Sequence, residues 1–581
     1  MSLLVASIDF GTTYSGWAFS FRHEFESDPT KVSAKNWSGG QLVSQKGPTC
    51  VLIRPDGKTL EEFGYEAENK YAELAIDECH KQWYYFRRFK MKLFNQGGVG
   101  RKLMLKDETG KKGLPAKIVF SGAIRYLKND LIKQSEKRIS GGGLTDADIK
   151  WVLTVPAIWN DAAKQFMREA AEEAGIAGDK LTIALEPEAA SVFCRHLPVD
   201  TTASAVTSSL ASFKAGTKYL VLDAGGGTVD ITVHEVGGSG ELKELYKASG
   251  GAWGGTKVDD AYEKFLVEIT GLGVMGAFKE SHMEDYIDLF RDFEIKKRDI
   301  STKKSGGKIN LRMPLALVET VKEVTGKTIK ETILGSAYGE RIKHHGDKIR
   351  VDADIVIELF DEPVTSILSH VSTLLKESAV RGCSKIVMVG GFSESPILQE
   401  RVQKRFSGMS VIVPNEAGLA VLKGAVIFGH SPTTIAERVC KFTYGYGSTH
   451  VYSETCSHPK GRRETDENGD LRCYDIFVRR ARVGEKVKLS QEGQESTTTP
   501  VFASQNTIGF EIYASLNPNP THTTEKECSK IGYLEIPIDD TSLGKDREFG
   551  VRFIFGGTEI EVKVEDKADK RVFRKRVDFL G

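Results

Sequence analysis

Two segments that lie far apart in the chain combine an aspartate with glycines and hydroxyl-bearing residues. Residues 8–16 read IDFGTTYSG, and residues 222–230 read LDAGGGTVD. In each segment the aspartate closes an apolar run, and a turn of glycine and threonine opens the next strand. A related glycine turn, VMVGGFSES at residues 387–395, follows a third apolar run. The N–H groups and hydroxyls of such turns can converge on an anion, so the pattern predicts phosphate binding.

The first two turns also suit a nucleotide with its metal ion. Glycine lets a phosphate oxygen approach the backbone because it carries no Cβ. Asp9 and Asp223 end the incoming strands, where a carboxylate can hold the water ligands of Mg²⁺. One such turn alone is equally typical of a hairpin, but two that face each other would hold the β- and γ-phosphates from both sides. The sequence has neither a P-loop motif nor a Rossmann glycine motif after a strand.

Strands alternate with helical segments from the start of the chain to about residue 430, which is the pattern of an α/β fold. Residues 150–155 are predicted as a strand, Asn160 as the N-cap of a helix that ends at Gly175, and residues 181–185 as the next strand. The serine- and threonine-rich residues 199–216 are predicted as an exposed loop. The repeated strand-turn-strand pattern indicates two similar halves that present their turns to a common cleft.

After about residue 432 the sequence changes to short runs of alternating apolar residues. Val551, Phe553 and Phe555 alternate before Gly556-Gly557, and the alternation resumes at Ile560. This pattern is typical of a β-hairpin with a two-residue turn. The last 150 or so residues are therefore predicted to form a compact all-β module.

The composition of the 581-residue chain is that of an ordinary soluble protein with more than one domain. Lysine plus arginine and aspartate plus glutamate both number 80, so the charge gives no reason to expect nucleic acid or an acidic membrane as a partner. The aromatic and basic run at residues 81–92 is open to interpretation as a nucleic-acid stacking surface, but the zero net charge disfavours it.

The sequence also indicates the cellular compartment of the protein. No apolar stretch is long enough to cross a membrane, and no secretory signal is recognisable, so we expect a cytoplasmic protein, with the nucleus as the alternative. The eight cysteines form no C-x-x-C pair, which is typical of reduced thiols. Cys456 and Cys473 are the only pair to keep in view as a candidate disulfide or metal site.

Several further motifs resemble the ATPase domain of the 70-kDa heat-shock protein family. They are LTVPAIWNDAAKQFMREAAEEAGI at residues 153–176, LEPEAAS at residues 185–191 and FEIKKRDIS at residues 293–301. The stretches QFMREAA, ELYKASGG, KGAV and FKMKL resemble in particular the divergent branch of heat shock 70 kDa protein 12. The resemblance covers the whole nucleotide-binding region and, more loosely, the β-rich region after it.

The resemblance implies a two-lobed actin-like, that is ribonuclease-H-like, ATPase domain of class α/β. This domain is expected over residues 1–432, with lobe I at about 1–216 plus 418–432 and lobe II at about 217–417. A small, all-β, substrate-binding-like domain without a helical lid is expected over residues 433–581.

The resemblance also assigns roles to residues of the first two turns. It implies that phosphate is bound by Gly11, Thr12, Thr13, Tyr14, Gly225, Gly226, Gly227 and Thr228. It implies that Asp9 and Asp223 hold Mg²⁺, mostly through water. It implies catalytic roles for Lys90, Glu186, Asp223, Thr228 and Asp230, with Lys92 as the alternative to Lys90. A lysine and Mg²⁺ would neutralise the γ-phosphate while carboxylates orient the attacking water.

The base and ribose are expected at a charged helix face. Helical spacing places Glu294, Lys297 and Arg298 on one face with Ser301 one turn later, which alone is typical of a surface charge cluster. The resemblance implies instead that these residues hold adenosine. It also implies that the third turn, with Gly390, Gly391 and Phe392, contacts the adenine.

The chain departs from the family pattern at several positions. Glu394 stands where the family carries an arginine against adenine, and an acidic residue near Gly418 is missing. Residues 430–442 lack the acidic and hydrophobic linker, and Lys164 replaces an arginine. The acidic tail motif that co-chaperones recognise is also absent. Phosphate and metal binding should survive these changes, whereas adenine selectivity is open.

Together these observations predict an ATP- and ADP-binding, Mg²⁺-dependent, chaperone-like stress-response protein. Slow ATP hydrolysis and nucleotide-gated binding of protein or peptide segments are expected. One alternative is a pseudo-ATPase adaptor or scaffold that binds nucleotide without turnover. Another is a small-molecule, sugar-type kinase of the same superfold, because a fold does not fix a function.

Overall fold

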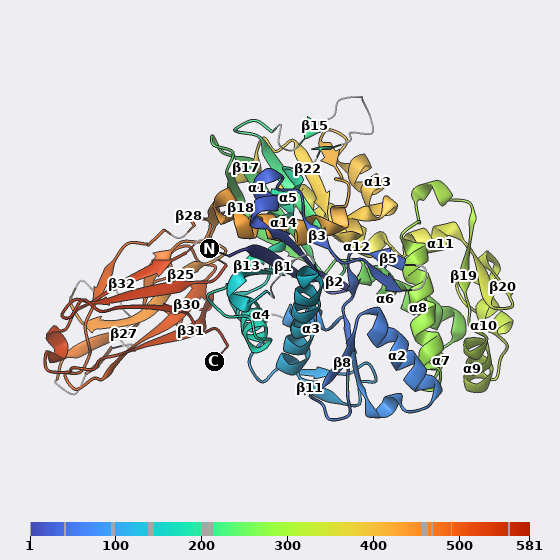
Figure 1. Ribbon diagram of the computed structural model, residues 1–581, viewed down its shortest axis with the longest axis horizontal. Coiled ribbons are helices and arrows are strands. Elements are labelled where there is room, and N and C mark those ends of the chain that lie inside the picture. Colours follow the sequence, from blue (N-terminus) through green and yellow to red (C-terminus); the bar gives the residue numbers. More distant parts are fainter. Residues whose placement is uncertain are drawn as a thin grey trace.

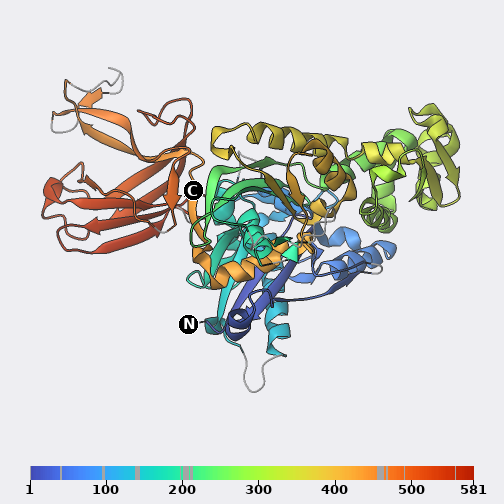
Figure 2. The same cartoon turned by 90° about the horizontal axis from the view of Figure 1, so that it is seen from above.

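The computed structural model of the protein divides into a larger helix-and-strand part and a smaller part built from strands (Figure 1). In both views the smaller part lies at one end of the molecule, and the C-terminus lies where the two parts meet (Figure 2). The structure describes residues 2–39, 42–94, 99–137, 144–196, 198–199, 208–209, 213–454, 463–465, 469–489, 491–555 and 558–580. Within these ranges no helix is both long and apolar enough to cross a bilayer.

The first of two large sheets has six strands. Its order is β13-β12-β1-β2-β3, with β6 also paired to β2. The hairpin of β1 and β2 is antiparallel, whereas β12 and β13 run parallel to β1. The strands are β1 (Leu4–Phe10), β2 (Tyr14–Phe21), β3 (Ser33–Ala34), β6 (Gly47–Pro48), β12 (Ile149–Val155) and β13 (Leu181–Leu185).

The second large sheet repeats this arrangement in the order β23-β22-β16-β17-β18-β24-β28. Its antiparallel hairpin of β16 and β17 is again flanked by two parallel strands, β22 and β23. The strands are β16 (Lys218–Ala224), β17 (Val229–Val236), β18 (Leu242–Gly251), β22 (Lys385–Val389), β23 (Ser410–Ile412), β24 (Ile435–Val439) and β28 (Lys486–Lys488). The shared order confirms the prediction of two similar halves.

Two helices, α5 (Glu186–Cys194) and α14 (Ala420–His430), hold the two sheets together. Their apolar side chains share one core with residues of both sheets, including Val152 and Val221. The helices cross closely, because a Cβ at Gly424 would stand 1.8 Å from the carbonyl oxygen of Ala189. The halves are thus fixed to each other beneath their turns.

Two more helices, α3 (Ala116–Glu136) and α4 (Asp161–Glu173), share a core with the six-stranded sheet. The predicted N-cap of α4 is confirmed, since the Asn160 side chain accepts a hydrogen bond from the Ala163 N–H at 2.9 Å. The helix ends just before Gly175, whose φ of 88° lies in the left-handed region. The predicted strand at residues 181–185 also agrees with β13.

Ten further helices complete the described part of the larger region. They are α1 (Arg22–Ser27), α2 (Tyr65–Ile76), α6 (Thr256–Thr270), α7 (Val274–Ser281), α8 (Met283–Lys297), α9 (Leu315–Thr325), α10 (Ile329–Gly335), α11 (Ala353–Glu358), α12 (Asp361–Leu374) and α13 (Pro396–Arg405). Four small sheets lie beside these helices in the described part of the chain. Two of them are pairs, β4 (Trp37–Gly39) with β5 (Leu42–Ser44) and β10 (Met104–Lys106) with β11 (Gly113–Pro115). The other two have three strands, in the orders β8 (Leu60–Phe63), β7 (Cys50–Ile53), β9 (Tyr84–Arg87) and β19 (Lys308–Arg312), β21 (Lys348–Asp352), β20 (Ile342–His345). The described residues of the predicted loop at 199–216 include a short pair, β14 (Pro198–Val199) with β15 (Ser208–Ser209), so this segment is not loop throughout.

The C-terminal strands form two sheets around their own apolar core. One sheet contains β26 (Arg463–Thr465), β27 (Leu471–Ala481), β25 (Thr443–Val451), β30 (Thr507–Ser515) and β31 (Cys528–Pro537). The other contains β29 (Ser496–Thr498), β32 (Phe549–Ile554), β33 (Glu561–Asp566) and β34 (Val572–Arg576). The pairing of β32 with β33 confirms the predicted hairpin, but the predicted two-residue turn at Gly556-Gly557 is wrong, because Ile554 pairs with Glu561 and the connection between the strands is longer. Gly556 and Gly557 themselves lie outside the described residues. Cys456 also lies outside them, so the candidate pair with Cys473 stays a prediction.

Candidate functional site

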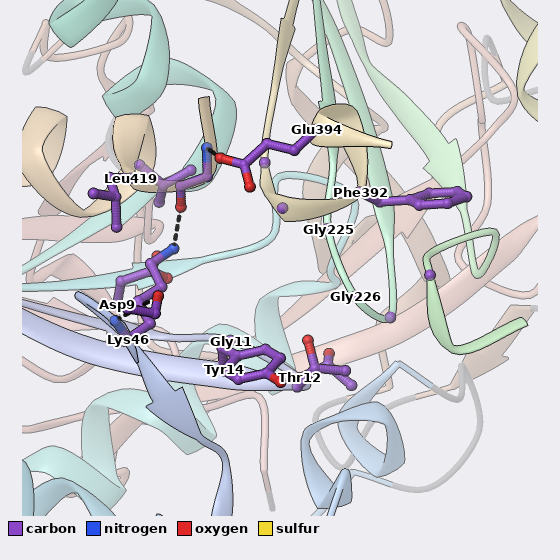
Figure 3. A pocket seen from close by; sticks show the side chains of 18 of the residues that line it. Asp9, Gly11, Thr12, Tyr14, Lys46, Gly225, Gly226, Phe392, Glu394 and Leu419 are labelled. Carbon is purple, nitrogen blue, oxygen red and sulfur yellow. Dashed lines mark hydrogen bonds and ion pairs between the residues drawn. The ribbon is translucent and has the colours of Figure 1, made fainter. Parts of the chain in front are cut away.

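The two predicted turns line one cavity of about 490 Å³ (Figure 3). The first turn (residues 11–14) joins β1 to β2, and the second turn (residues 225–228) joins β16 to β17. Asp9 lies opposite Gly16 in the first hairpin, and Asp223 lies opposite Asp230 in the second. Equivalent positions of the repeated hairpins therefore meet at the same space.

The turns approach each other so closely that their glycines are required. A Cβ at Gly227 would lie 2.5 Å from Thr12 Oγ1, and a Cβ at Gly226 would lie 2.1 Å from Thr13 Oγ1. The third turn (residues 390–394) lies against the end of β16 that leads into the second turn, because a Cβ at Gly390 would lie 2.4 Å from Asp223 Oδ1. Gly390 also has a φ of 86°, which favours glycine.

The two aspartates that precede the turns differ in their partners. Thr154 Oγ1 donates to Asp9 Oδ1 at 2.8 Å, and Lys46 Nζ lies 2.6 Å from Asp9 Oδ2. Burial alone would raise the pKa of Asp9, but the Lys46 ammonium lowers it below its ordinary value. In contrast, Asp223 Oδ2 is buried with no hydrogen-bond partner among the described residues. Burial and the carboxylates of Glu186 and Asp230 raise the pKa of Asp223 well above its ordinary value.

Lys90 and Glu186 form an ion pair on the wall of the cavity. Lys90 follows β9 in a short 3-10 helix (Phe89–Leu93), and its Nζ donates to Glu186 Oε1 at 2.6 Å. Burial raises the pKa of Glu186 to about 7, against the opposing effect of the Lys90 ammonium. Lys92 is exposed and does not line the cavity, so of the two lysines only Lys90 faces the predicted site.

The charged face of α8 lies on another wall of the cavity. As the spacing predicts, Glu294 contacts both Lys297, at 2.5 Å, and Arg298, at 2.9 Å. The Arg298 guanidinium also lies 5.3 Å from the centre of the Tyr14 ring. These four residues line the cavity, whereas Ser301 and Asp230 are not among the lining residues. Asp230 lies just behind the wall, where its Oδ1 accepts a hydrogen bond from the Ile158 N–H at 2.8 Å.

The third turn presents an aromatic ring and a carboxylate instead of an arginine. Phe392 is buried, and its ring lies 6.5 Å from that of Phe360, which also lines the cavity. Glu394 Oε1 accepts a hydrogen bond from the Gly418 N–H at 2.9 Å (Figure 3). Glu416 lines the cavity two residues before Gly418, so this segment contributes a carboxylate that sequence reasoning missed.

Lys46 is a second charged cavity residue that sequence reasoning missed. It is a single lysine in the loop between β5 and β6, and no periodicity or motif marks it. It reaches the cavity because β6 pairs with β2 beside the first turn. Its position thus depends on strand pairing that the local sequence does not reveal.

The carboxylates suit a metal ion that keeps most of its water. Among the described residues, no group of three or more histidine, cysteine, aspartate or glutamate side chains could hold a metal ion directly. Mg²⁺ is commonly held by one or two carboxylates together with water and phosphate oxygens. The unpartnered Oδ2 of Asp223, close to the second turn, fits this kind of site.

Comparison with known proteins agrees with this architecture. A family model described as Hsp70 protein matches residues 130–434. Over its full length the chain is 33% identical to heat shock 70 kDa protein 12B of Homo sapiens, of which it covers 91%, and 33% identical to heat shock 70 kDa protein 12A of the same organism, of which it covers 92%. A chaperone protein DnaK of Picrophilus torridus is 25% identical over 325 residues, which are 54% of this chain and 45% of that protein.

Two repeated α/β halves that share one cavity, together with the matched family model, define a protein with an Hsp70 ATPase domain of actin-like fold. The chain belongs to the Hsp70 family, and its full-length similarity is to the branch of heat shock 70 kDa protein 12. The resemblance drawn from the sequence motifs is thereby confirmed.

Proposed function

We propose that this protein binds ATP and ADP with Mg²⁺, hydrolyses ATP slowly, and uses its nucleotide state to gate the binding of protein segments. The observation that carries the proposal is the meeting of two equivalent glycine turns, one from each half, at a single cavity. Membership in the Hsp70 family supports nucleotide binding and a chaperone-like role.

The phosphate end of the cavity supplies the groups that hydrolysis needs. The backbone N–H groups of both turns would bind the β- and γ-phosphates. Lys90 would neutralise charge on the transferred phosphoryl group, while Glu186 and Asp230 would orient the attacking water and Thr228 would donate a hydrogen bond. Mg²⁺, when bound near Asp223 and Asp9, would supply further charge neutralisation.

The base end of the cavity departs from the family pattern. We propose that the ribose lies against Glu294 and Lys297 and that the base lies between Arg298 and Phe392, all of which line the cavity. Glu394 places negative charge where the family carries an arginine against adenine. The adenine should therefore contribute less to nucleotide binding than the phosphates do.

A nucleotide-binding adaptor without turnover is the second candidate. The observation in its favour is that Lys90 and Glu186 satisfy each other at 2.6 Å. Hydrolysis would require at least one of them to engage phosphate or water instead.

We further propose that residues 433–581 form the segment-binding domain, without a helical lid, and that residues 1–432 form the ATPase domain. Contacts between the two support nucleotide gating. β24, which follows the proposed boundary, pairs in parallel with β18 of the second large sheet. Arg438 in this strand forms a buried ion pair with Glu188 of α5, at 2.5 Å, two residues after Glu186.

A second connection starts at the catalytic carboxylate proposed at position 230. The Ile158 N–H donates to Asp230, and the neighbouring carbonyl groups of Ala157 and Trp159 accept hydrogen bonds from Lys441 Nζ. A change at Asp230 on nucleotide binding would therefore reach Lys441, in the connection between β24 and β25 that leads into the C-terminal sheets.

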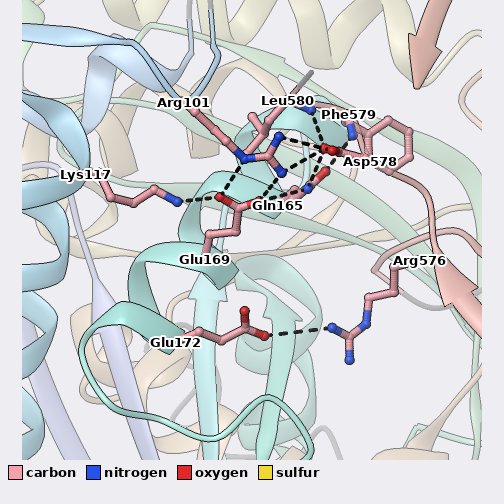
Figure 4. A network of polar contacts seen from close by, with 9 residues as sticks. All are labelled: Arg101, Lys117, Gln165, Glu169, Glu172, Arg576, Asp578, Phe579 and Leu580. Carbon is pink, nitrogen blue, oxygen red and sulfur yellow. Dashed lines mark hydrogen bonds and ion pairs between the residues drawn. The ribbon is translucent and has the colours of Figure 1, made fainter. Parts of the chain in front are cut away.

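The C-terminal segment makes a third contact (Figure 4). Arg101 contacts Glu169 of α4 at 2.7 Å and Asp578 at 3.0 Å, and the Phe579 N–H donates to Gln165 at 2.6 Å. These polar contacts lie on the surface, where ion pairs are individually weak. The next residue, Leu580, is buried in the core that the six-stranded sheet shares with α3 and α4, so the segment is also anchored by an apolar contact.

The test of the function is the melting temperature with Mg·ATP, Mg·ADP and Mg·GTP, measured together with phosphate release. A ligand at a hundred times its Kd stabilises the folded state by about 2.7 kcal/mol. We expect a shift with all adenine nucleotides and slow release of phosphate. A shift without release favours the adaptor, release that requires an added sugar favours a kinase, and no shift contradicts nucleotide binding.

The gating is tested by hydrogen exchange of residues 435–454 with and without Mg·ATP. We expect nucleotide to change the protection of β24 and β25 in the wild-type chain. Arg438→Met should abolish that change, whereas Arg574→Met, exposed in β34 and paired with β33, should leave it intact. Equal protection in all states would contradict the gating.

A further inference from the structure

Lys46 places a fixed positive charge at the phosphate end of the cavity. Its Nζ lies 2.6 Å from Asp9 Oδ2 and donates to the carbonyl oxygen of Gly418 at 2.7 Å (Figure 3). The side chain is only 14% exposed and lines the cavity. This ammonium is therefore held in place by the protein before any ligand arrives.

The strand register makes room for this lysine. Gly47 pairs with Ser15, and Asp9 pairs with Gly16, so Lys46 lies beside the first hairpin. A Cβ at Gly16 would stand 2.8 Å from the Gln45 carbonyl oxygen and 3.1 Å from Lys46 Cγ. The glycine at position 16 thus leaves the space that the loop and the stem of Lys46 occupy.

Lys46 also fixes the segment at the base end of the cavity. Gly418 accepts a hydrogen bond from Lys46 through its carbonyl oxygen and donates one to Glu394 through its N–H. The backbone at Gly418 is therefore held by Lys46 on its carbonyl side and by Glu394 on its N–H side. This bracing limits the movement of the Lys46 ammonium relative to the first turn.

The two halves differ in the partners of the aspartate that precedes each turn. The carboxylate of Asp9 already has one partner on each oxygen, Thr154 on Oδ1 and Lys46 on Oδ2. The equivalent carboxylate, Asp223, has a buried oxygen without a hydrogen-bond partner in the described part of the chain. Asp223 is therefore the less satisfied of the two carboxylates and the better acceptor for the water ligands of a metal ion.

Lys46 can still bind a ligand. An ammonium group has three N–H donors, and Asp9 and Gly418 take two of them. The third is available to a phosphate oxygen in the cavity. Lys46 would therefore cancel the repulsion between Asp9 and a phosphate and add a hydrogen bond of its own.

We propose that Lys46 is a built-in counter-ion of the phosphate site, which neutralises Asp9 and binds a phosphate oxygen, so that nucleotide binding persists without a divalent metal ion. The metal ion is then left to Asp223. This inference rests on the proposed nucleotide function and names a positioning and binding residue for it.

The test is calorimetric titration of ADP into the full chain, once with Mg²⁺ and once with EDTA. We expect the wild-type Kd to rise less than about tenfold when the metal is removed. A hydrogen bond to a charged group contributes about 1.5–3 kcal/mol, so Lys46→Met should weaken binding in EDTA by about ten- to a hundredfold. In Mg²⁺ its loss should be smaller, because a metal ion held at Asp223 then supplies positive charge to the phosphates.

Two more variants keep the test decisive if Lys46→Met is poorly folded. Lys46→Gln loses the charge but can still donate to Gly418, and it should show the same loss in EDTA. Lys46→Arg keeps the charge and should retain metal-free binding. Lys58→Met, at an exposed position outside the cavity, is the matched control and should bind as the wild type does.

Three results would overturn the inference while leaving nucleotide binding intact. They are a wild-type chain that binds ADP only with Mg²⁺, a Lys46→Gln variant that binds as well as the wild type in EDTA, and a variant that binds more tightly in Mg²⁺ because the lysine competes with the metal. Absence of binding in both buffers would instead contradict the proposed function itself.

Discussion

Gly226 of the second turn lies against Thr13 of the first turn so closely that a Cβ at position 226 would stand 2.1 Å from Thr13 Oγ1. It would also stand 2.6 Å from Cγ2 and 2.9 Å from Cβ of the same threonine. No rotation of the threonine side chain removes the last of these contacts. The two halves of the domain therefore touch through their turns, and the glycine is needed for that contact as well as for access to phosphate.

Gly226→Ala should accordingly separate the two turns. Overpacking of this kind costs about 1–3 kcal/mol of folding free energy. We expect a lower melting temperature and loss of the stabilisation by Mg·ADP. Gly238→Ala is the control, because a Cβ at Gly238 meets nothing within 4 Å. If Gly226→Ala binds ADP normally, the turns do not hold the phosphates together.

Lys90→Met should impair hydrolysis more than binding. Removing a preorganised group that stabilises transition-state charge lowers turnover by about 10²–10³-fold. We expect that loss in single-turnover phosphate release, with the nucleotide-induced shift in melting temperature largely retained. Lys92→Met should release phosphate at the wild-type rate, because its side chain is exposed. If Lys92→Met slows phosphate release and Lys90→Met does not, Lys92 and not Lys90 is the catalytic lysine.

Glu394→Arg should strengthen the binding of adenine nucleotides. The change removes a carboxylate near a polyanion and supplies a guanidinium group that can stack on the base, which is worth about 1 kcal/mol or roughly fivefold in Kd. Glu394→Gln removes the charge alone and separates the two effects. ATP titrations of both variants are the measurement. If Glu394→Arg binds ATP no better than Glu394→Gln does, the base does not lie against position 394.

His234 should make the stability of the chain depend on pH in the acid range. It is buried in β17, where its Nδ1 lies 3.3 Å from Ser191 Oγ, and burial lowers its pKa from 6.5 to about 4. The folded state then binds fewer protons than the unfolded state between these values. The contribution of His234 to stability is therefore present above pH 6.5 and is lost as the pH falls through about 4.

This depression corresponds to about 3 kcal/mol of unfolding free energy over that interval. Urea unfolding of His234→Gln at pH 7, 5.5 and 4.5 should show a flatter pH dependence than the wild type. His23→Gln, at an exposed position, should reproduce the wild-type dependence. Parallel curves for His234→Gln and the wild type would mean that folding does not lower the pKa of His234.

Sequence patterns predicted the features that depend on local chemistry. The turns were predictable because close approach of two backbones admits few residues besides glycine, and those glycines lie against Thr12 and Thr13. The N-cap at Asn160 was predictable because its side chain satisfies a nearby N–H group. The hairpin of β32 and β33 was predictable from its alternation.

Features that depend on pairing between distant segments were not predictable. Lys46 reaches Asp9 only through the register of β6 on β2, and a lone lysine in a loop carries no pattern. The contact between Glu394 and Gly418 joins two loops whose separate sequences give no sign of it. The addition of β24 to the second sheet likewise depends on tertiary contacts, among them the Arg438–Glu188 ion pair.

The central claim is that both turns hold the phosphates of one nucleotide. A crystal structure of the chain with Mg·ADP tests it most directly. We predict that the β-phosphate lies between the turns, within hydrogen-bond distance of backbone N–H groups from both residues 11–14 and residues 225–228. Nucleotide bound to one turn alone or elsewhere, or no nucleotide at saturating concentration, would contradict the account.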